Sequence, residues 1–393
     1  MGDEKLRVLI VIGSLTRGGG AERVAATLGN QLSVRGHEVH SLTFYRAENA
    51  HPVEGVEHCF DERMVRSTLD AGWKMVQRAW KIRKLCRKHR IDLTVSFMEE
   101  ANFCALFAKI FFFQRNPAIV SVRNNFRYSG RLYRFLIRLL YPRADRVVAV
   151  SRQIEEMLKD DFGLRNTTTI YNPIDSDIAA RVAQPLEERY RWIGERSTVF
   201  VAVGRQVRQK GHWHLIRAFQ RVAAKRPDAT LILLGSGELG AKLDGLIEAC
   251  GLSEKVFRIG LQKNVFPFLR ASHCFVMSSL WEGLPNAMIE ALATGLPVLA
   301  ADCSTGPREV LAPDLALNQA VPYPHRSGCG TLLPPLSGEE RFLPIESLPL
   351  SQEEEALAEA MIAFEAPPQK QPRSECLERF GMDGIMERWL SLF

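Results

Sequence analysis

The sequence WEGLPNAMIEALATG, residues 281–295, places two glutamates eight positions apart on either side of a Gly-Leu-Pro turn. Glu282 precedes the turn, and Glu290 lies in the apolar run that follows it. Pro285 suits the first turn of a helix, so a helix with unsatisfied backbone amides is predicted to begin here. The amides could bind a phosphate, and a carboxylate could accept two hydrogen bonds from a vicinal diol. For Glu290 alone, an exposed helix position is the default interpretation.

Around this stretch, short β-branched runs alternate with longer helical patterns through both halves of the 393-residue chain. Strands are expected at 6–12, 38–44, 92–97, 118–122 and 146–150, and again at 198–203, 229–234, 256–259, 273–278 and 297–301. First-half helices are expected near 20–35, 66–89, 100–112, 130–141 and 152–162, and further helices separate the later strands. This alternation is typical of parallel sheets covered by helices on both faces. The predicted fold class is α/β, with two doubly wound, Rossmann-like domains that divide near YNPIDSD (171–177) and face a central cleft.

The composition is that of an ordinary globular protein, with 46% apolar and 24% charged residues. The eight cysteines include no CxxC pair and no zinc or disulfide pattern, so free thiols in a reducing compartment are expected. The first apolar run, 8–13, has the length of a strand, so it is not interpreted as a signal peptide. The run at 103–113 is too short to span a bilayer and contains Lys109. A cytoplasmic location is therefore expected.

The charge is unevenly distributed along the chain. Residues 1–150 contain 25 Lys and Arg against 14 Asp and Glu, a balance of +11, and the other 243 residues have a balance of −5. A basic first half suggests that one domain faces an anion or an anionic surface. Nucleic acid is not expected as the partner, because no binding motif is present and aromatic residues are not interleaved with the basic ones.

Ligands of doubly wound sheets bind at the loops that follow the carboxyl ends of the strands. The loop after the first strand, GSLTRGGGAER (13–23), has three glycines before a helix. Backbone amides and the helix dipole at such a turn favour an anion. On this loop alone, a tight turn without a ligand fits equally well.

The corresponding loop of the second half is GRQVRQKGHWH (204–214). Arg205 offers a planar fork for phosphate, and Lys210 adds a point charge before the next helix. Two cations at a strand end suit a diphosphate, although most basic clusters are solvated loops.

The spacing Glu-x7-Glu, with GLPN and EALATGLPV around the acids, resembles the donor-site signature of retaining glycosyltransferases of the GT-B fold, glycosyltransferase family 4. Similar motifs follow in the family's order: GGGAER near the start, ADRVVAVS (144–151), YNPID (171–175), GR...KG (204–211), LLGSGEL (233–239) and DCSTGPREVL (302–311). The resemblance covers nearly the whole chain up to Pro335. GGAER and TGPRE are most similar to the subgroup that builds lipopolysaccharide cores, exopolysaccharides and lipid-linked oligosaccharides.

This resemblance implies the transfer of a sugar from a nucleotide sugar, expected to be UDP-linked, to a lipid-linked glycan or polysaccharide precursor. Retention of anomeric configuration, with no metal and no cofactor, is implied as well. Residues 1–172 would bind the acceptor and residues 173–376 the donor. The final helix, 377–393, would pack back on the first domain.

The resemblance also implies roles for individual residues. Arg205 and Lys210 would hold the diphosphate and stabilise the leaving group, and Glu282 completes the expected catalytic set by binding sugar hydroxyls. Glu290 would bind the ribose diol. The remaining donor contacts would come from Gly18, Gly19, Gly20, Arg258, Ile259, Gly283, Leu284, Pro285 and Asn286.

Two segments depart from the family pattern. Many relatives have a histidine after the fourth strand of the first domain, where this chain reads SVRNNF, so Arg123 and Asn124 are expected to face the donor or acceptor. Residues 336–350 look like an insertion after GTLLPP (330–335), and a surface loop is expected there.

Two apparent metal motifs are better explained otherwise. Asp175-Ser176-Asp177 spells DxD, but it lies at the domain crossing, where a hinge turn is favoured. His212 and His214, at i and i+2, lie on different helix faces. No metal site is therefore expected.

The predicted helix at 66–89 has a basic face, with an aromatic flank formed by Trp73 and Trp80. A second helix repeats the arrangement. We predict that one or both faces bind anionic lipid or the diphosphate of a lipid-linked acceptor, which would place the protein at the inner face of the cell membrane; a solvated charged face is the alternative. The basic residues are Lys74, Arg78 and Lys81 on the first helix, and Arg131, Arg134 and Arg138 on the second.

Two other functions stay open at this point. One is a nucleotide-sugar epimerase of the same fold, and the other is a sugar-nucleotide-binding protein without catalysis. The intact Glu-x7-Glu spacing together with Arg205 and Lys210 favours transfer over both.

Overall fold

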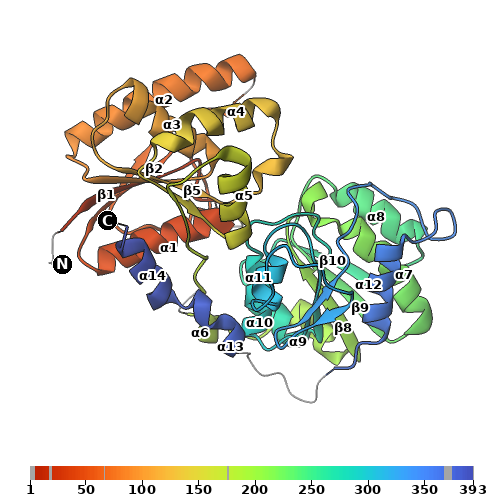
Figure 1. The fold of residues 1–393 in the computed structure, drawn as a ribbon. Coiled ribbons are helices and arrows are strands. Elements are labelled where there is room, and N and C mark those ends of the chain that lie inside the picture. Colours follow the sequence, from red (N-terminus) through yellow and green to blue (C-terminus); the bar gives the residue numbers. More distant parts are fainter. Residues whose placement is uncertain (1–4, 17–19, 66, 175–176, 367–373, 393) are drawn as a thin grey trace. The chain divides into compact units, whose positions relative to one another are not determined.

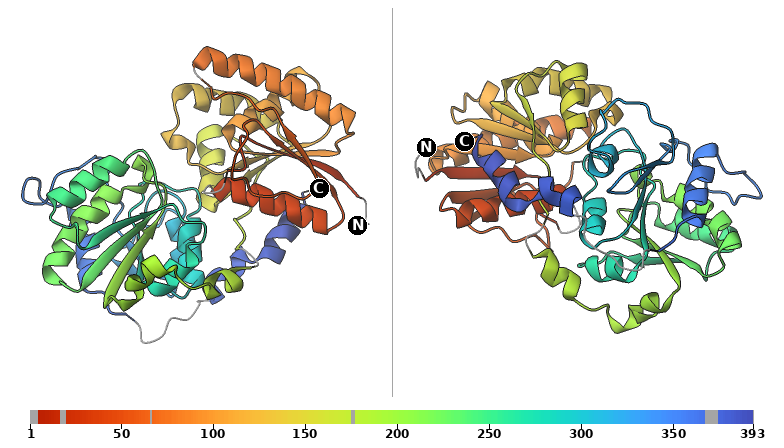
Figure 2. Two further views of the ribbon diagram at one scale, coloured as in Figure 1. Left: turned by 180° about the vertical axis from the view of Figure 1, so that it is seen from behind. Right: turned by 60° about the horizontal axis from the view of Figure 1, so that its bottom comes forward.

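The computed structural model describes residues 5–16, 20–65, 67–174, 177–366 and 374–392. The chain forms two compact units, drawn in Figures 1 and 2. Unit 1 comprises Met1–Pro173 and Asp383–Phe393, and unit 2 comprises Ile174–Met382. The division after Pro173 falls inside the segment YNPIDSD, where the sequence pattern changes.

The sheet of unit 1 has seven strands in the order β3-β2-β1-β4-β5-β6-β7, all paired in parallel. Its central strands are buried on both faces, which explains their continuous apolar runs. The strands are β1 (Arg7–Ile12), β2 (Glu38–Thr43), β3 (Val56–Cys59), β4 (Leu93–Phe97), β5 (Ala118–Val122), β6 (Arg146–Ala149) and β7 (Thr167–Thr169).

Helices cover both faces of this sheet (Figure 1). On one face, Ile82 and Cys104 belong to the buried cluster that joins α2 and α3 to β1 and β2. On the other face lie α1 and α14, where the Trp389 ring is 6.0 Å from that of Phe97 in β4. The last helix therefore completes the core of unit 1. The helices of this unit are α1 (Gly20–Val34), α2 (Thr68–Lys88), α3 (Glu99–Phe111), α4 (Arg131–Leu140), α5 (Arg152–Phe162) and α14 (Met382–Leu390).

The sheet of unit 2 also has seven strands, in the order β10-β9-β8-β11-β12-β14-β13. Only the pair β13 and β14 is antiparallel. The prediction of two doubly wound α/β sheets is confirmed by these two topologies. The strands are β8 (Thr198–Val203), β9 (Ala229–Leu234), β10 (Val256–Gly260), β11 (Cys274–Met277), β12 (Val298–Ala301), β13 (His325–Arg326) and β14 (Thr331–Leu333).

Two groups of helices enclose the second sheet (Figure 1). Trp213, Leu243 and Leu357 come from three helices on one face and meet in a single buried cluster with strand residues such as Phe200. These helices are α7 (His212–Lys225), α8 (Gly240–Ala249) and α12 (Gln352–Ile362). The opposite face carries α9 (Phe266–Ala271), α10 (Asn286–Ala293) and α11 (Pro307–Leu311), and the unit also contains α6 (Ile178–Ala183) and α13 (Ser374–Leu377).

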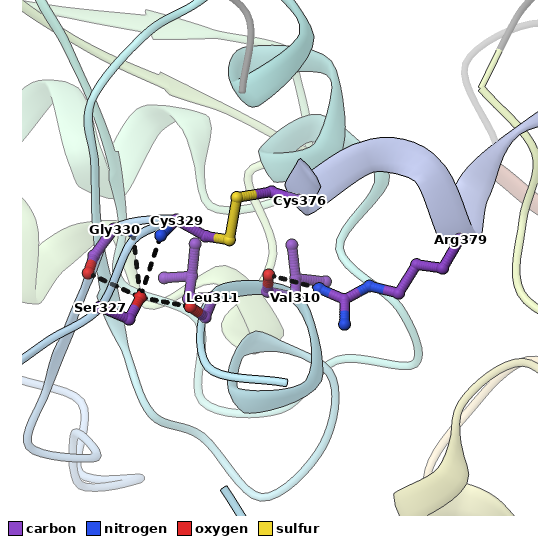
Figure 3. The surroundings of a disulfide bond; sticks show 7 residues. All are labelled: Val310, Leu311, Ser327, Cys329, Gly330, Cys376 and Arg379. Atoms are coloured by element: carbon purple, nitrogen blue, oxygen red, sulfur yellow. Dashed lines mark hydrogen bonds between the residues drawn. A yellow bond between two sulfur atoms is a disulfide. The ribbon is translucent and has the colours of Figure 1, made fainter. Parts of the chain in front are cut away.

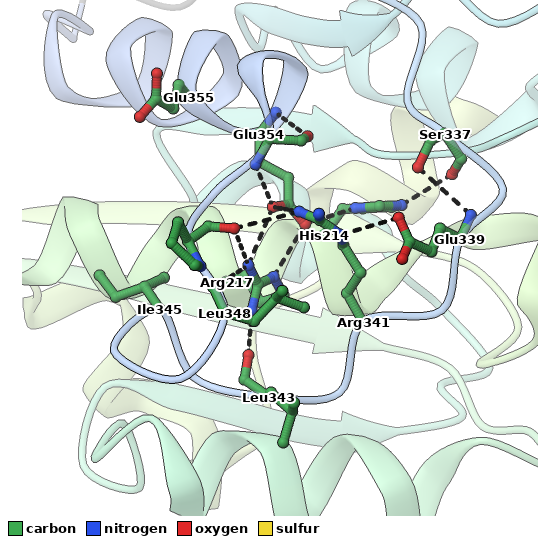
Figure 4. Close-up of polar contacts among 12 residues, drawn as sticks. His214, Arg217, Ser337, Glu339, Arg341, Leu343, Ile345, Leu348, Glu354 and Glu355 are labelled. Carbon is green, nitrogen blue, oxygen red and sulfur yellow. Dashed lines mark hydrogen bonds and ion pairs between the residues drawn. The ribbon is translucent and has the colours of Figure 1, made fainter.

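The insertion at 336–350 is anchored to α7 by a buried polar network (Figure 4). Arg217 Nη2 donates to the carbonyl oxygens of Leu348 (2.6 Å) and Pro349 (3.0 Å). Its Nε donates to Glu354 at the start of α12 (3.0 Å), as does His214 Nδ1 (2.7 Å). Burial alone would raise the pKa of Glu354, but the bonds with His214 and Arg217 lower it to about 2. His214 therefore has a structural partner, and the surface loop expected here is held by α7.

Cys329 and Cys376 form a disulfide bond (Figure 3), which corrects the expectation that all the cysteines are free thiols. The bond links the segment before β14 to α13, across a sequence separation of 47. Nearby, Arg379 Nη2 donates to the carbonyl oxygen of Val310 in α11 (2.9 Å). The other six cysteines are free. The covalent bond and the hydrogen bond together fasten the start of the C-terminal segment to unit 2.

Candidate active site

The loop after β8 lies directly against the loop after β11 in unit 2. Gly211 has a φ of +55°, and a Cβ there would lie 2.3 Å from the carbonyl oxygen of Ser278, so only glycine fits this approach. Ser278 Oγ donates to the carbonyl oxygen of Lys210 (2.9 Å), and the amide of Leu280 donates to that of Gln209 (2.8 Å). These contacts fix the backbone of Lys210 at the carboxyl end of the sheet.

Lys210 and Glu282 form a charge pair across these two loops. The Lys210 Nζ lies 2.5 Å from Glu282 Oε1, and Ser279 Oγ donates to the same oxygen (2.6 Å). Glu282 is only 5% exposed. Two residues that the sequence assigns to catalysis therefore lie in direct contact.

A third loop, after β12, supports the Gly-Leu-Pro turn from behind. Thr305 Oγ1 donates to the carbonyl oxygen of Glu282. Gly306 has a φ of +94°, and a Cβ there would lie 2.7 Å from Cδ of Pro285. Arg308 in α11 is buried and pairs with Asp302 (2.5 Å), which ties the start of this loop to the helix that follows it. These residues belong to the motif DCSTGPRE, whose supporting role the sequence did not reveal.

The backbone amides predicted to bind sugar and phosphate are fewer than expected. Pro285 has no N–H, and the amide of Asn286 donates to the carbonyl oxygen of Leu284 (3.0 Å). Among the described residues, the amides of Gly283 and Leu284 have no hydrogen-bond partner. Two unpartnered amides are therefore available in this segment, and its predicted role in binding sugar and phosphate stays a prediction. Glu290 lies in α10, and its side chain is half-buried.

Arg205 and Arg258 differ although both were assigned to the donor. The exposed side chain of Arg205 makes no ion pair or hydrogen bond with the described part of the chain. Arg258, in contrast, donates to Gln206 Oε1 (3.1 Å) and to the carbonyl oxygen of Gly240 (2.8 Å), and it pairs with Asp244. Its guanidinium links the loop after β8 to α8, and half-buried Ile259 follows it in β10.

Gln206 was not identified from the sequence, yet it organises this edge of the sheet. The residue is fully buried, and Nε2 donates to the carbonyl oxygen of Gly235 (2.9 Å). A Cβ at Gly237 would lie 2.4 Å from the carbonyl oxygen of Gln206. No local pattern identifies such a residue, because its partners lie about 30 and 50 positions away.

In unit 1, Gly18 and Gly19 lie outside the described residues, whereas Gly20 begins α1 and is exposed. The donor role predicted for the three glycines stays a prediction.

Arg123, after β5 in unit 1, is a buried cation with incomplete hydrogen bonding. It is 7% exposed, and its Nη1 donates to Asn172 Oδ1. Its guanidinium lies 5.0 Å from the ring centroid of Phe97. Nε and Nη2 have no partner among the described residues, and burial lowers the pKa of the group to about 9. Unpartnered donors on a buried arginine suit an anionic or hydroxyl-rich ligand.

Glu99, at the start of α3, is a second candidate in unit 1 that the sequence did not single out. Burial raises its pKa, although a hydrogen bond with Asn124 opposes the shift. Its Oε1 is buried and has no partner among the described residues. A carboxyl group that has a hydrogen bond with Asn124 and one unpartnered oxygen could accept a further hydrogen bond from an acceptor hydroxyl.

The predicted basic face of α2 is wrong at its centre. Arg78 is 1% exposed and donates to Glu62 (2.9 Å), to Glu100 (2.5 Å) and to the hydroxyl of Tyr45 (3.1 Å). Lys81 also pairs with Glu62 (2.9 Å), and Lys74 with Asp70 (3.5 Å). All three cations are paired with acids of unit 1, and Arg78 is buried, so the three do not form one free basic face.

The second predicted helix, α4, does present basic and apolar side chains to solvent. Arg131 and Arg138 are exposed, and Arg134 is half-buried. Leu132, Phe135 and Leu139 are each more than half exposed and recur at i, i+3 and i+7 on one face. Among the described residues, no helix has the length and apolar composition needed to cross a bilayer.

Comparisons with known proteins agree with this geometry. The family model described as Glycosyltransferase Family 4 matches residues 18–178, and that described as Glycosyl transferases group 1 matches residues 187–322. An uncharacterized glycosyltransferase of Methanocaldococcus jannaschii is 39% identical over 335 residues, 81% of this chain and 82% of the relative.

Two further proteins are informative because their names or ligands are specific. A Campylobacter jejuni protein named N-acetylgalactosamine-N,N'-diacetylbacillosaminyl-diphospho-undecaprenol 4-alpha-N-acetylgalactosaminyltransferase is 31% identical, covering 75% of this chain and 81% of its own length. The Anabaena HepE structure in complex with UDP and glucose superposes with a TM-score of 0.73 at 18% identity, covering 98% of both chains. The chain belongs to the family 4 glycosyltransferases and has the GT-B fold.

Proposed function

We propose that this glycosyltransferase transfers a sugar from a UDP-linked donor to a lipid-linked glycan, with retention of anomeric configuration. The Lys210–Glu282 pair, beside the unpartnered amides of Gly283 and Leu284, is the observation that carries the proposal. Support for the acceptor class comes from the Campylobacter relative, whose name includes a diphospho-undecaprenol substrate.

The donor diphosphate would lie against the positive end of α10 and the two cations of the β8 loop. Lys210 is fixed by its backbone contacts, and the exposed Arg205 can approach a phosphate oxygen bidentately. Because Lys210 already contacts Glu282, the diphosphate would share or displace that carboxylate. Glu282 would then be released to bind sugar hydroxyls, and Glu290 would bind the ribose diol.

In the proposed reaction, the acceptor oxygen bonds to the anomeric carbon on the face from which the nucleoside diphosphate departs. The bond between that carbon and the diphosphate oxygen breaks, and the leaving group takes the electron pair. A phosphate oxygen of the leaving group takes the acceptor proton. The protein contributes position and positive charge, supplied by Lys210 and Arg205.

The acceptor is proposed to use polar groups of unit 1. Arg123 has two unpartnered nitrogens for a hydroxyl or phosphate oxygen, and Glu99 has one unpartnered carboxyl oxygen. Both follow the carboxyl ends of strands in the sheet of unit 1, where doubly wound sheets bind ligands.

The membrane contact is proposed to involve α4, since this helix combines exposed apolar side chains with exposed arginines. Leu132, Phe135 and Leu139 would enter the headgroup boundary, while Arg131 and Arg138 would meet anionic phosphates. A lipid-linked acceptor would then be reached from the inner face of the membrane. In that reducing compartment, Cys329 and Cys376 would tend to be thiols, which gives the location a chemical test.

The decisive experiment incubates the purified protein with radiolabelled UDP-sugars, with and without a lipid extract. Transfer predicts label in the lipid fraction only when the extract is present, whereas epimerisation would convert the UDP-sugar without it. NMR coupling constants of the product linkage then report retention or inversion. The UDP assignment would be overturned if no UDP-sugar labelled any lipid and a sugar linked to a different nucleotide released that nucleotide.

A further inference from the structure

A cavity lies in unit 1 at the opposite edge of the sheet from the strand carboxyl ends. Its volume is about 520 Å³, and its walls come from the last turns of α2 and from the connection between α3 and β5. Asn116 and Ile91, which line it, precede β5 and β4 respectively. Arg123 and Glu99 follow the carboxyl ends of β5 and β4, so this cavity is separate from the acceptor site proposed above.

The cavity is lined by three arginines and by no acidic residue. Arg83, Arg87 and Arg115 make no ion pair or hydrogen bond through their side chains within the described part of the chain. On the same helix, Arg78 and Lys81 are each paired with a glutamate. Unpaired like charges around one cavity repel each other, and a bound anion would remove that cost.

A buried amide faces the same cavity with one end unpartnered. Gln114 is 7% exposed; its Nε2 lies 3.3 Å from Thr94 Oγ1, and its Oε1 has no partner among the described residues. Asn116 Nδ2 also donates to Thr94 Oγ1 (2.8 Å). Turning the Gln114 amide over lets the Thr94 hydroxyl donate to Oε1 and accept from Asn116, so its NH₂ group becomes the unpartnered end. This unpartnered end is itself buried, in a residue that lines the cavity beside three arginines.

An exposed aromatic side chain also lines the cavity. Phe113 is 79% exposed and has a φ of +53°, a backbone conformation that a bulky residue rarely adopts. The ring could cover an apolar or sugar portion attached to the anion.

We propose that this cavity binds a phosphate-bearing anion through Arg83, Arg87 and Arg115. Arginine is suited to this because its planar fork donates two parallel hydrogen bonds to phosphate oxygens. The ligand is either a free phosphate compound or a phospholipid headgroup, and the two share the chemistry that the cavity recognises.

The test measures the binding of inorganic pyrophosphate to the full-length protein by titration calorimetry. Saturating UDP is present to occupy the donor site. The Arg83→Gln/Arg87→Gln variant should bind pyrophosphate at least tenfold more weakly than the wild type. Arg143→Gln/Arg165→Gln is the matched control, because it removes the same charge from two exposed arginines of unit 1 outside the cavity. A thermal midpoint for each variant verifies that it is folded.

A second arm measures binding to phosphatidylcholine vesicles with and without 20% phosphatidylglycerol. A loss confined to pyrophosphate supports a free phosphate compound, and a loss confined to the anionic vesicles supports a headgroup. Equal binding by the wild type and the Arg83→Gln/Arg87→Gln variant in both arms would overturn the proposal. An equal loss in the control variant would also overturn it, because general charge would then explain the binding.

Discussion

The ammonium group of Lys210 lies 2.5 Å from a carboxylate oxygen of Glu282, and the two residues come from loops that follow different strands of the same sheet. A buried pair of this kind costs stability when one partner is removed, because the other charge is left without compensation. The pair therefore links the folding of the site to its chemistry.

Replacing Lys210 with alanine should lower kcat about 100-fold, since one preorganised charge at the leaving group is lost. Lys210→Arg should retain part of the activity because it keeps the charge. Steady-state kinetics with the labelled donor, with Lys263→Ala as an exposed control in the same unit, measure the effect. A wild-type kcat in folded Lys210→Ala protein would contradict the proposed role.

Glu290→Ala should weaken donor binding more than it changes turnover. The lost hydrogen bonds to a charged group are worth roughly 1.5–3 kcal/mol, or about 10- to 100-fold in donor affinity. Calorimetric titration with UDP measures this directly, and Glu359→Ala on the exposed side of α12 is the control. Unchanged UDP affinity would exclude Glu290 as the ribose ligand.

Glu354 should make unit 2 sensitive to acid. Its pKa in the folded protein is about 2, below the ordinary value of 4.5, so its stabilising contribution is complete above pH 4.5 and disappears as the pH falls toward 2. The shift corresponds to about 3 kcal/mol. The free energy of unfolding, measured with urea at pH 6 and at pH 3, should change less with pH in Glu354→Gln than in the wild type. An equal change in the free energy of unfolding between pH 6 and pH 3 in the two proteins would contradict this.

Removing the disulfide by Cys329→Ser/Cys376→Ser should destabilise unit 2 by about 2–4 kcal/mol, the range typical for a closed loop of this length. Denaturant unfolding with and without reductant measures the change, and reductant should have no effect on the double variant. Counting reactive thiols in denatured protein from its native compartment should give six if the bond is formed there and eight if it is not.

The exposed apolar face of α4 should govern membrane binding. Changing Leu132, Phe135 and Leu139 to serine should reduce partitioning to anionic vesicles more than 100-fold, because each buried side chain contributes about 1.5–3 kcal/mol. Leu261→Ser/Leu343→Ser is the control, since these exposed side chains lie in unit 2. Unchanged sedimentation of the triple variant with vesicles would show that another surface makes the contact.

The fold was largely predictable because both sheets are parallel and their buried strands carry continuous apolar runs. Strand β3 (Val56–Cys59) was missed for the opposite reason: it lies at a sheet edge and is largely exposed, so its sequence VEHC shows no apolar pattern. Strand β13, which pairs antiparallel with β14, was missed because a two-residue strand has no period to recognise.

The site was predictable where the motif residues act locally. It was unpredictable where partners distant in the sequence determine how a side chain is buried or paired. The helix position of Arg78 suggested an exposed basic face, but Glu62 and Glu100, which bury it, come from other segments. The disulfide was missed for the same reason, since nothing near Cys329 identifies Cys376 as its partner.

Trp389 of α14 packs against Phe97 of β4, which lies almost 300 positions earlier in the chain. During synthesis, the sheet of unit 1 leaves the ribosome before unit 2, and Trp389, which packs on that sheet, leaves after unit 2. Phe97 therefore lacks its final packing partner, Trp389, while the whole of unit 2 is made, and it is either exposed or covered by other residues during that time. For this chain, the order of synthesis and the order of final assembly differ, because unit 1 is completed by a helix that is made after unit 2.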